Sequence, residues 1–196
     1  TVRVYRRPRI TLLTSGNELV DPHPHIPPGK LPDSNRFLLL GLAQTARAEI
    51  VHWNRLPDAL EPVKEALRTA SEAGDLVVTT GGVSVGEADL LKAAFTSLGG
   101  HIDIWRIAIK PGKPFASGRL GACHWFGLPG NPVATFVTWQ LLVRPALRRL
   151  EGEVDVSGRL VSARLAEPLT NRGDRLHALR VRLDSAGVVR PIGTQA

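Results

Sequence analysis

The sequence predicts an α/β fold, in which a three-layer α/β/α domain with a mostly parallel sheet is followed by a small, partial all-β domain. From residue 9 to about residue 150, short runs of β-branched and apolar residues alternate with longer runs of helical period. This alternation is typical of a parallel sheet covered on both faces. After Glu151, three strand-like runs follow one another without a helix between them. We therefore place the two domains at residues 7–152 and 153–196.

The α/β part is expected to alternate strands with helices. The strands are expected at residues 10–13, 49–54, 75–80, 102–109 and 122–128. The helices are expected at residues 34–48, 58–73, 89–98 and 131–150. In open sheets of this kind, ligands bind at the carboxyl ends of the strands.

Local signals mark where these helices begin and bend. Asp33 or Ser34 is a candidate N-cap for the first helix, and Asp58 three residues before Glu61 resembles a capping box for the second. Pro145 lies inside the last helical run, where proline removes a backbone donor. A bend is therefore expected there.

The residues after the α/β part favour a β domain that is incompletely present. Strands are expected at residues 158–166, 176–183 and 188–192, with a hairpin turn at residues 184–187. About 45 residues are few for a domain with its own core.

The composition is that of a folded domain. Hydrophobic residues make up 43% and charged residues 22% of the 196 residues, which argues against disorder. The longest apolar runs, such as residues 37–40, are far shorter than the ~20 residues of a membrane span, so no membrane helix is expected.

Cysteine and methionine usage adds two expectations. The single cysteine, Cys123, excludes an internal disulfide and a multi-cysteine zinc site, which suits a cytoplasmic location. No secretory leader is recognisable. Methionine is absent, position 1 included, so we expect the chain to be part of a longer protein.

The net charge of +7 does not predict nucleic-acid binding. Residues 1–10 hold four arginines and no acid, and residues 141–196 hold ten arginines against six acids. The residues between them are nearly neutral. A basic nucleic-acid binder would require the terminal arginines to form one stripe.

The first of three candidate ligand loops is TTGGVSVGEAD at residues 79–89. Gly81 and Gly82 follow a buried strand, so the backbone can turn sharply and point N–H groups at an anion such as phosphate. A tight strand-to-helix turn without a ligand explains the glycines equally well. The spacing matches neither a dinucleotide fingerprint nor a Walker A loop.

The second loop runs from Lys110 to Pro114 and holds two of the five lysines of the chain. Lysine presents a compact positive charge to phosphate or oxyanion groups, and the flanking prolines reduce the entropy lost in fixing it. The alternative is a solvated charged loop.

The third loop is Gly127-Leu128-Pro129-Gly130-Asn131-Pro132, between an apolar strand and a helix. The first N–H groups of that helix could receive an anion. An N-cap at Asn131 with Pro132 at the first helical position is a complete structural explanation of those two residues, although not of Pro129 and Gly130.

Four acids lie near these loops: Glu18, Asp33, Glu87 and Asp89. A carboxylate beside bound phosphates usually acts through Mg²⁺ or positions a nucleophile, and Asp89 is the best placed. Each acid on its own is more often a helix cap or a solvated surface group.

Together the three loops resemble the molybdopterin molybdenumtransferase family, which includes the bacterial MoeA proteins and the gephyrin E domain. TTGGVSVGEAD, IKPGKPFASG and GLPGNPVATFVT occur in the family's order and spacing, and RRPRITLLTSGNEL and PDSN resemble its first strand-loop and following helix start. The resemblance is strong over residues 7–150 and weak over residues 158–196.

The resemblance implies a molybdopterin-binding α/β domain that acts in molybdenum cofactor biosynthesis. The family places molybdenum from molybdate on adenylylated molybdopterin and releases AMP in a step assisted by a divalent metal such as Mg²⁺. The catalytic residues would be Asp89, Lys110 and Lys113, and the metal ligands Asp89 and Glu18. The ligand-binding residues would be Gly81, Gly82, Val83, Ser84, Gly112, Pro129, Gly130, Asn131 and Pro132, with Asp33 and Ser34 at the rim.

The family pattern is not complete in this chain. Its first loop usually reads TGDE, but Ser15-Gly16-Asn17-Glu18 has Asn17 in place of the acid, which could weaken metal binding. The family's two N-terminal domains, one of which helps to build a homodimer, have no counterpart here. The expected partners are therefore the small-molecule substrates, a second copy of the full-length protein and a molybdopterin adenylyltransferase, with no nucleic acid and no membrane.

Two other functions stay open. A non-catalytic molybdopterin-binding or scaffolding module would keep the fold, and Asn17 favours it, whereas Asp89, Lys110 and Lys113 favour the enzyme. A molybdopterin adenylyltransferase shares the fold but typically carries GGTG after this strand, so Val83 and Ser84 argue against it.

Overall fold

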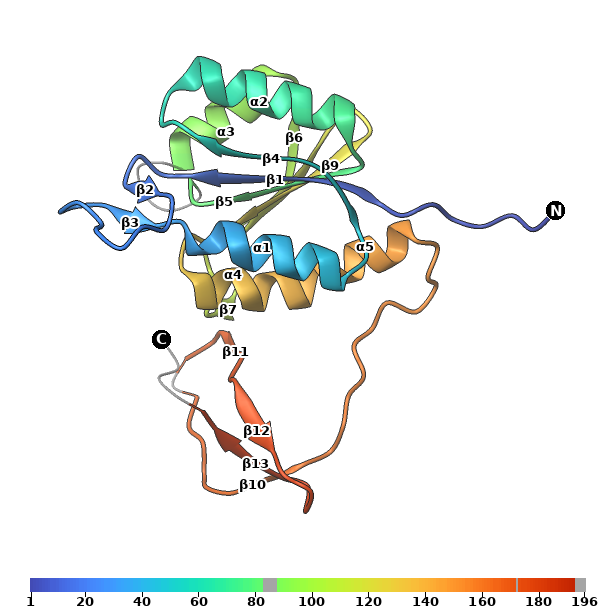
Figure 1. The fold of residues 1–196 in the computed structure, drawn as a ribbon. Helices are drawn as coiled ribbons and strands as arrows, with labels where there is room; N and C mark the ends of the chain where they lie inside the picture. Colours follow the sequence, from blue (N-terminus) through green and yellow to red (C-terminus); the bar gives the residue numbers. More distant parts are fainter. Residues whose placement is uncertain (83–87, 172, 193–196) are drawn as a thin grey trace.

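The computed structural model describes residues 1–82, 88–171 and 173–192, and its centre is a six-stranded sheet between two layers of helices (Figure 1). The strands of the sheet are β1 (Arg9–Ser15), β4 (Glu49–Leu56), β5 (Leu76–Thr80), β6 (His101–Trp105), β8 (Ala116–Leu120) and β9 (Cys123–Leu128). They lie in the order β4-β1-β5-β9-β8-β6. The first four are parallel, whereas β8 is antiparallel to both of its neighbours.

Helices cover both faces of the sheet, as predicted. They are α1 (Ser34–Thr45), α2 (Leu60–Ala73), α3 (Ala88–Ser97), α4 (Pro132–Thr138) and α5 (Arg144–Leu150). One face carries α2 and α3 and the other carries α1, α4 and α5 (Figure 1). Each face has its own core, one around Trp125 and Phe95 and the other around Trp139 and Leu39. The three-layer α/β/α architecture is confirmed.

The central strands are the ones with the clearest sequence signal. All five residues of β5 are buried, and so are the five inner residues of β1. Strands buried on both faces need apolar or β-branched residues at every position. This is why their predicted ranges were nearly correct.

The sheet edge beyond β9 differs from the prediction. The strand expected at 102–109 ends at Trp105, where Arg106 turns to a positive φ of 72°, and β8 was not predicted. The sequence of β8, ASGRL, contains no β-branched residue, so strand propensity does not mark it. Its central residue, Gly118, lies against the neighbouring strand. A Cβ at Gly118 would lie 2.3 Å from the carbonyl oxygen of His101.

The helical run at 131–150 is continuous but not uniform. A π-helical turn, Trp139–Val143, separates α4 from α5. Pro145 follows this turn, and proline has no N–H for the helical hydrogen bond. The irregularity expected at Pro145 therefore takes the form of a wide turn just before it.

One predicted cap is confirmed and another is wrong. The Asp33 side chain accepts a hydrogen bond from the Arg36 N–H and caps α1. The N-cap of α2 is Ala59, which makes no side-chain cap bond. Asp58 instead contacts the loop after β1, so the capping box does not form.

The C-terminal segment forms a small sheet below the helices α4 and α5 (Figure 1). Its strands are β10 (Arg164–Leu165), β12 (Val181–Leu183) and β13 (Val188–Pro191), in the order β10-β13-β12. The predicted hairpin is confirmed, because β12 and β13 are antiparallel and Asp184 accepts from the N–H groups of Ala186 and Val188 in the turn. The division of the chain at residue 152 stays a prediction.

The strand expected at 158–166 shrinks to the two residues of β10. Residues 158–163 are exposed, and an extended segment without a neighbouring strand gains no ladder hydrogen bonds. The run expected at 176–183 splits into β11 (Leu176–His177) and β12. No helix in the described part of the chain is long and apolar enough to cross a membrane.

Two further pairs of short strands lie outside these sheets. β11 pairs in parallel with β7 (Ile109–Lys110), and β2 (Leu19–Val20) pairs in parallel with β3 (Leu31–Pro32). The first pair attaches the C-terminal segment to the loop that follows β6. The second pair holds the loop after β1 beside the start of α1.

Candidate functional site

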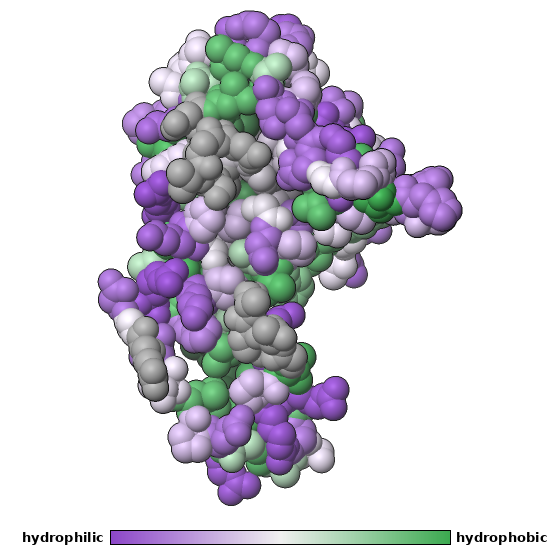
Figure 2. All heavy atoms as spheres, turned by 90° about the vertical axis from the view of Figure 1, so that its left-hand side faces the viewer, coloured by the Kyte–Doolittle hydropathy of each residue, from purple (hydrophilic) through white to green (hydrophobic). Residues whose placement is uncertain are grey.

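Four loops meet at one edge of the sheet. Because β1, β5 and β9 are parallel and β6 runs in the same direction, the segments that follow all four strands leave at their carboxyl ends. This is the left-hand edge in Figure 1. Figure 2 faces this edge and shows mostly hydrophilic residues, with small apolar areas between them. The three predicted ligand loops and the Glu18 loop therefore belong to one end of the domain.

A cavity of about 400 Å³ opens at this edge, within the ~300–1,000 Å³ typical of small-molecule sites. It is lined by Ser15, Glu18, Leu19, Leu31, Pro32, Asp33, Ser34, Asn35, Thr80, Gly81, Gly130 and Pro132. The lining combines apolar side chains with a few polar groups. It includes six of the predicted site residues: Glu18, Asp33, Ser34, Gly81, Gly130 and Pro132.

Asp33 is a structural anchor of the cavity wall. It is 1% exposed, and its two carboxylate oxygens accept from the Thr14 hydroxyl at 2.6 Å and from the Arg36 N–H at 3.0 Å. These bonds join the end of β1 to the first turn of α1. Both oxygens of the side chain are therefore engaged by the protein itself.

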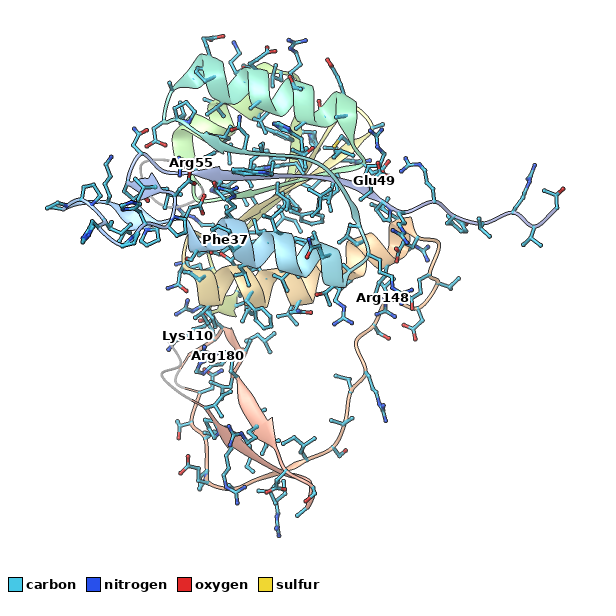
Figure 3. The ribbon with its side chains drawn as sticks, viewed as in Figure 1. Phe37, Glu49, Arg55, Lys110, Arg148 and Arg180 are labelled. Atoms are coloured by element: carbon cyan, nitrogen blue, oxygen red, sulfur yellow. The ribbon has the colours of Figure 1, made fainter. Side chains whose placement is uncertain are left out.

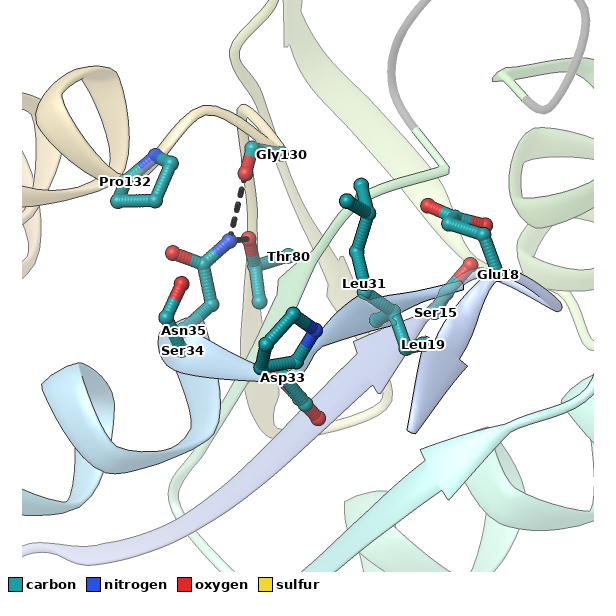
Figure 4. A pocket seen from close by; sticks show the side chains of 12 residues that line it. Ser15, Glu18, Leu19, Leu31, Asp33, Ser34, Asn35, Thr80, Gly130 and Pro132 are labelled. Carbon is teal, nitrogen blue, oxygen red and sulfur yellow. Dashed lines mark hydrogen bonds between the residues drawn. The ribbon is translucent and has the colours of Figure 1, made fainter. Parts of the chain in front are cut away.

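A buried hydrogen-bond network forms the floor of the cavity (Figure 4). The Asn35 amide nitrogen donates to the Thr80 hydroxyl oxygen at 3.0 Å and to the Gly130 carbonyl at 2.7 Å. The Thr80 hydroxyl donates to the Pro129 carbonyl at 2.9 Å, and Thr135 donates to the same carbonyl at 2.6 Å. The network fixes α1, the end of β5 and the loop after β9 relative to one another.

Gly81 and Gly82 make the sharp turn that the sequence predicted. Their φ angles are +80° and +65°, which L-residues with a Cβ rarely adopt. A Cβ on Gly81 would also lie 2.3 Å from the Ser15 carbonyl oxygen. Glycine at position 81 is therefore required both by conformation and by the close approach of the loop after β1.

The loop after β9 has two parts with different roles. Asn131 caps α4 by accepting from the N–H groups of Val133 and Ala134, and Pro132 takes the first helical position. Pro129 is buried in the network, and Gly130 lines the cavity close to Gly81. The cap explains Asn131 and Pro132, of which Pro132 also lines the cavity, while Pro129 belongs to the buried network and Gly130 to the cavity lining.

Glu18 is the one described carboxylate at the cavity that makes no hydrogen bond or ion pair with another described side chain. It is half-buried, and its oxygens lie over Gly16, where a Cβ would be 2.6 Å away. Mg²⁺ commonly takes one or two protein carboxylates together with substrate phosphates. Glu18 fits that use as a single ligand. No cluster of three His, Cys, Asp or Glu residues occurs in the described part of the chain.

Asn17 pairs with Asp58 rather than facing the cavity. The Asn17 N–H donates to the Asp58 carboxylate at 3.1 Å, and the Asp58 N–H donates to the Asn17 side-chain oxygen at 3.3 Å. The other carboxylate oxygen of Asp58 is buried without a hydrogen-bond partner among the described residues. The amide at position 17 therefore joins the loop after β1 to the start of α2.

The lysine loop lies at the same edge but does not line the cavity. Lys110 and Lys113 are exposed, whereas Gly112 is buried, where a Cβ would lie 2.8 Å from the Thr138 side chain of α4. Figure 3 shows Lys110 below α4, where the C-terminal segment approaches. The Lys110 carbonyl accepts from the Ala178 N–H at 2.8 Å, so the segment after β11 holds this loop.

Three predicted site residues cannot be placed. Val83 and Ser84 lie outside the described residues, and so does the side chain of Asp89, although its backbone belongs to α3. Their assignment as ligand, catalytic and metal residues stays a prediction.

Sequence reasoning missed Asn35, Thr80 and Asp58. Asn35 is 9% exposed, in the second position of α1, and a buried side-chain amide at a helix start is a signal for a polar network. Thr80 is the last residue of a strand whose residues are all buried, so its hydroxyl needed a partner. Asp58 was assigned to a cap, and only the three-dimensional fold brings it to Asn17.

Cys123 takes no part in the site. Burial, with the nearby Asp75 charge as a smaller cause, raises the pKa of its thiol to about 11. The thiol is therefore protonated at neutral pH, as expected of a small buried residue.

The fold and this edge define a ligand-binding α/β domain. A family model described as "Probable molybdopterin binding domain" matches residues 11–149. The chain is 41% identical over 152 residues to a molybdopterin molybdenumtransferase of Haemophilus influenzae, which covers 78% of this chain and 37% of that protein. It is 30% identical over 188 residues to a molybdopterin molybdenumtransferase of Staphylococcus aureus, and this match covers 95% of this chain and 45% of that protein.

A crystal structure of a molybdopterin biosynthesis MoeA protein from Pyrococcus horikoshii is similar with a TM-score of 0.80 at 32% identity. The match covers 96% of this chain and 46% of that chain. The chain therefore belongs to the molybdopterin-binding domain family of molybdenum cofactor biosynthesis, and it spans less than half the length of these relatives.

Proposed function

We propose that the protein of which this chain is part inserts molybdenum from molybdate into adenylylated molybdopterin and releases AMP. The observation that carries the proposal is the meeting of the cavity, the two glycine loops and the lysine loop at one edge of the sheet. The full-length relatives named above are molybdopterin molybdenumtransferases, which supports the same reaction.

In the proposed reaction the chain binds and orients its substrate rather than supplying a nucleophile. Release of AMP breaks the phosphoanhydride with water, whose oxygen stays on one of the two phosphates formed. Such a step needs neutralisation of charge and correct positioning more than covalent chemistry. Lys110 and Lys113 supply positive charge. Gly81 and Gly82 have no Cβ, so a phosphate can approach their backbone closely.

Mg²⁺ bound at Glu18, with Asp89 as the second proposed ligand, would supply further neutralisation of the phosphates. Glu18 is suited to this because its carboxylate accepts no hydrogen bond from another described side chain. The Asn17–Asp58 pair holds the loop that carries Glu18.

The test is incubation of the full-length protein with adenylylated molybdopterin, molybdate and Mg²⁺, with AMP followed by chromatography. We expect AMP release that depends on molybdate, and its loss in Asp89→Asn without loss of the folded state. Asp103→Asn, an exposed acid on β6, is the matched control. Binding of the substrate without AMP release above background would contradict the enzyme and leave a binding module.

A further inference from the structure

A second hollow lies between α5 and the segment that follows it. Its volume is about 910 Å³, within the ~300–1,000 Å³ typical of small-molecule sites. One wall consists of residues from 140 to 148 and the other of residues 155–159. No described residue lines both this hollow and the cavity at the sheet edge. The hollow, which we call the arginine hollow, is therefore a separate place on the molecule.

The helical period puts arginine on the first wall. Gln140, Arg144 and Arg148 are four residues apart, so their side chains leave the helical run on one face. The residue before each of the three is buried in the core that packs against the sheet. This face of the run therefore points away from the core and into the arginine hollow.

Arg148 shapes the second wall. Its Nε and Nη2 atoms donate to the Glu153 carboxylate. Its guanidinium also donates, at 3.2–3.3 Å, to the carbonyl oxygens of Asp155, Val156 and Ser157. Figure 3 shows Arg148 beside the segment that leaves α5. These bonds use the five N–H groups of the guanidinium, so Arg148 holds the wall and is not available to a ligand.

Arg144 and Arg159 are the arginines of the hollow that remain available. Arg144 donates to the neutral side-chain oxygen of Gln140 at 3.2 Å, and neither arginine makes an ion pair with a described residue. Asp155, the acid of the lining, already accepts from the N–H and the hydroxyl of Ser157. Because Glu153 balances Arg148, the hollow keeps a net positive charge.

The chemistry of two such side chains favours a phosphomonoester. A guanidinium presents its N–H groups as a planar fork that matches phosphate. A phosphomonoester carries about −1.5 to −2 charges at pH 7 and three acceptor oxygens, so one phosphate can bond both forks, whereas one carboxylate matches a single fork. Leu141, Pro145 and Val156 supply apolar surface for the carbon part of the ester.

A nucleic-acid strand fits the arginines less well, because its binding draws on many phosphate contacts. Arg6 pairs with Asp75 and Arg9 pairs with Glu49. The hollow itself offers only Arg144 and Arg159. The terminal arginines therefore do not supply a continuous stripe of free positive charge.

We propose that the arginine hollow binds a small phosphomonoester, with Arg144 and Arg159 on the phosphate and Leu141 against the carbon part. The site lies outside the proposed reaction and does not depend on it.

The experiment is calorimetric titration with phenyl phosphate of a Lys110→Ala, Lys113→Ala protein, in which the lysine loop no longer contributes positive charge. We expect binding, and we expect Arg144→Gln and Arg159→Gln each to raise the dissociation constant about tenfold, because each removes one charge-assisted contact. Arg164→Gln is the matched control, since it removes an exposed arginine of β10 that does not line the hollow. All three arginines are exposed, so the melting temperature should not change.

Two further measurements test the chemistry and the place. Affinity should increase from pH 5 to pH 7.5, because the second ionisation of the phosphate has a pKa of about 6, and benzoate should bind at least about tenfold more weakly as a monoanion. Phenyl phosphate should slow amide hydrogen exchange in residues 155–159 and leave that of β5 unchanged.

Four results would overturn the proposal. They are no binding of phenyl phosphate, an equal loss in Arg164→Gln, binding of benzoate as tight as that of phenyl phosphate, and protection of β5 instead of residues 155–159. A phosphoserine peptide that bound more tightly than phenyl phosphate, and was lost in the same two variants, would assign the hollow to a phosphorylated protein partner and would also overturn it.

Discussion

The cavity and the lysine loop lie at the same edge of the sheet but are held in different ways. The cavity is fixed by buried side-chain hydrogen bonds within the α/β domain, centred on Asn35 and Thr80. The lysine loop is fixed by its backbone, through β11 and through the packing of Gly112 on α4. Its two charged side chains are exposed.

Because of this difference, substitutions in the two regions should have different effects on the stability of the domain and on its binding of ligands. Changes in the cavity floor remove buried bonds and should destabilise the domain together with ligand binding. Changes in the lysine side chains remove exposed charge and should affect the binding of anions alone. The C-terminal segment matters to the second region because it supplies the strand that pairs with β7.

The largest effect is expected from Gly81→Ala. The new Cβ would lie 2.3 Å from the Ser15 carbonyl oxygen in addition to the cost of a positive φ, so we expect a loss of about 3–4 kcal/mol in the free energy of unfolding. Gly99→Ala is the control, because Gly99 has nearly the same φ of +79° but nothing within 4 Å of its Cβ position. It should lose only about 1–2 kcal/mol. Equal losses in urea unfolding would contradict the close packing of the two loops.

A smaller loss is expected from Thr80→Val. The change keeps the shape of a buried side chain but removes the hydroxyl between Asn35 and Pro129, which should cost about 1–2 kcal/mol. The control Thr45→Val removes an exposed hydroxyl bonded within α1 and should change stability by less than about 0.5 kcal/mol. Thermal unfolding measures both. If Thr80→Val were as stable as its control, the network would not hold the cavity.

Lys110→Ala should leave the melting temperature unchanged, because the side chain is exposed. We expect the dissociation constant for pyrophosphate to rise about tenfold, as one charge-assisted hydrogen bond is lost, and the effect to shrink as salt is raised. Lys64→Ala on α2, whose lysine pairs with Glu61, is the control and should not alter binding. Unchanged pyrophosphate binding in Lys110→Ala would remove the lysine loop from the site.

The smallest effect is expected from Ala178→Pro. Proline has no N–H to donate to the Lys110 carbonyl, so the amides around Lys110 should exchange hydrogen faster while those of β5 keep their protection. Ala163→Pro lies in the exposed stretch before β10 and serves as the control. Faster exchange throughout the sheet after Ala178→Pro would show that the two regions are not held independently.

The fold could be predicted where burial dictates the sequence. The strands β1 and β5 were found because every inner position is buried. The strand β8 was missed because Gly118 is selected by a neighbouring backbone and not by strand propensity. The short strand β11 depends on β7, a partner that lies far away in the sequence.

The site was predicted where glycine, proline and lysine mark loops, and missed where a polar residue is buried. Gly81 and Gly130 were found and line the cavity. Asn35 was not found, because its importance comes from bonds to Thr80 and Gly130, which are distant in sequence. Likewise, no local pattern predicts that Asp58 contacts Asn17.

The most direct test of the proposed site is a crystal structure of the protein with adenylylated molybdopterin. We expect the ligand in the cavity lined by Glu18 and Gly81, with phosphate oxygens within about 3 Å of the Lys110 or Lys113 side chain. A structure with the ligand bound elsewhere, and with no ligand contact to the cavity or to either lysine, would contradict this account.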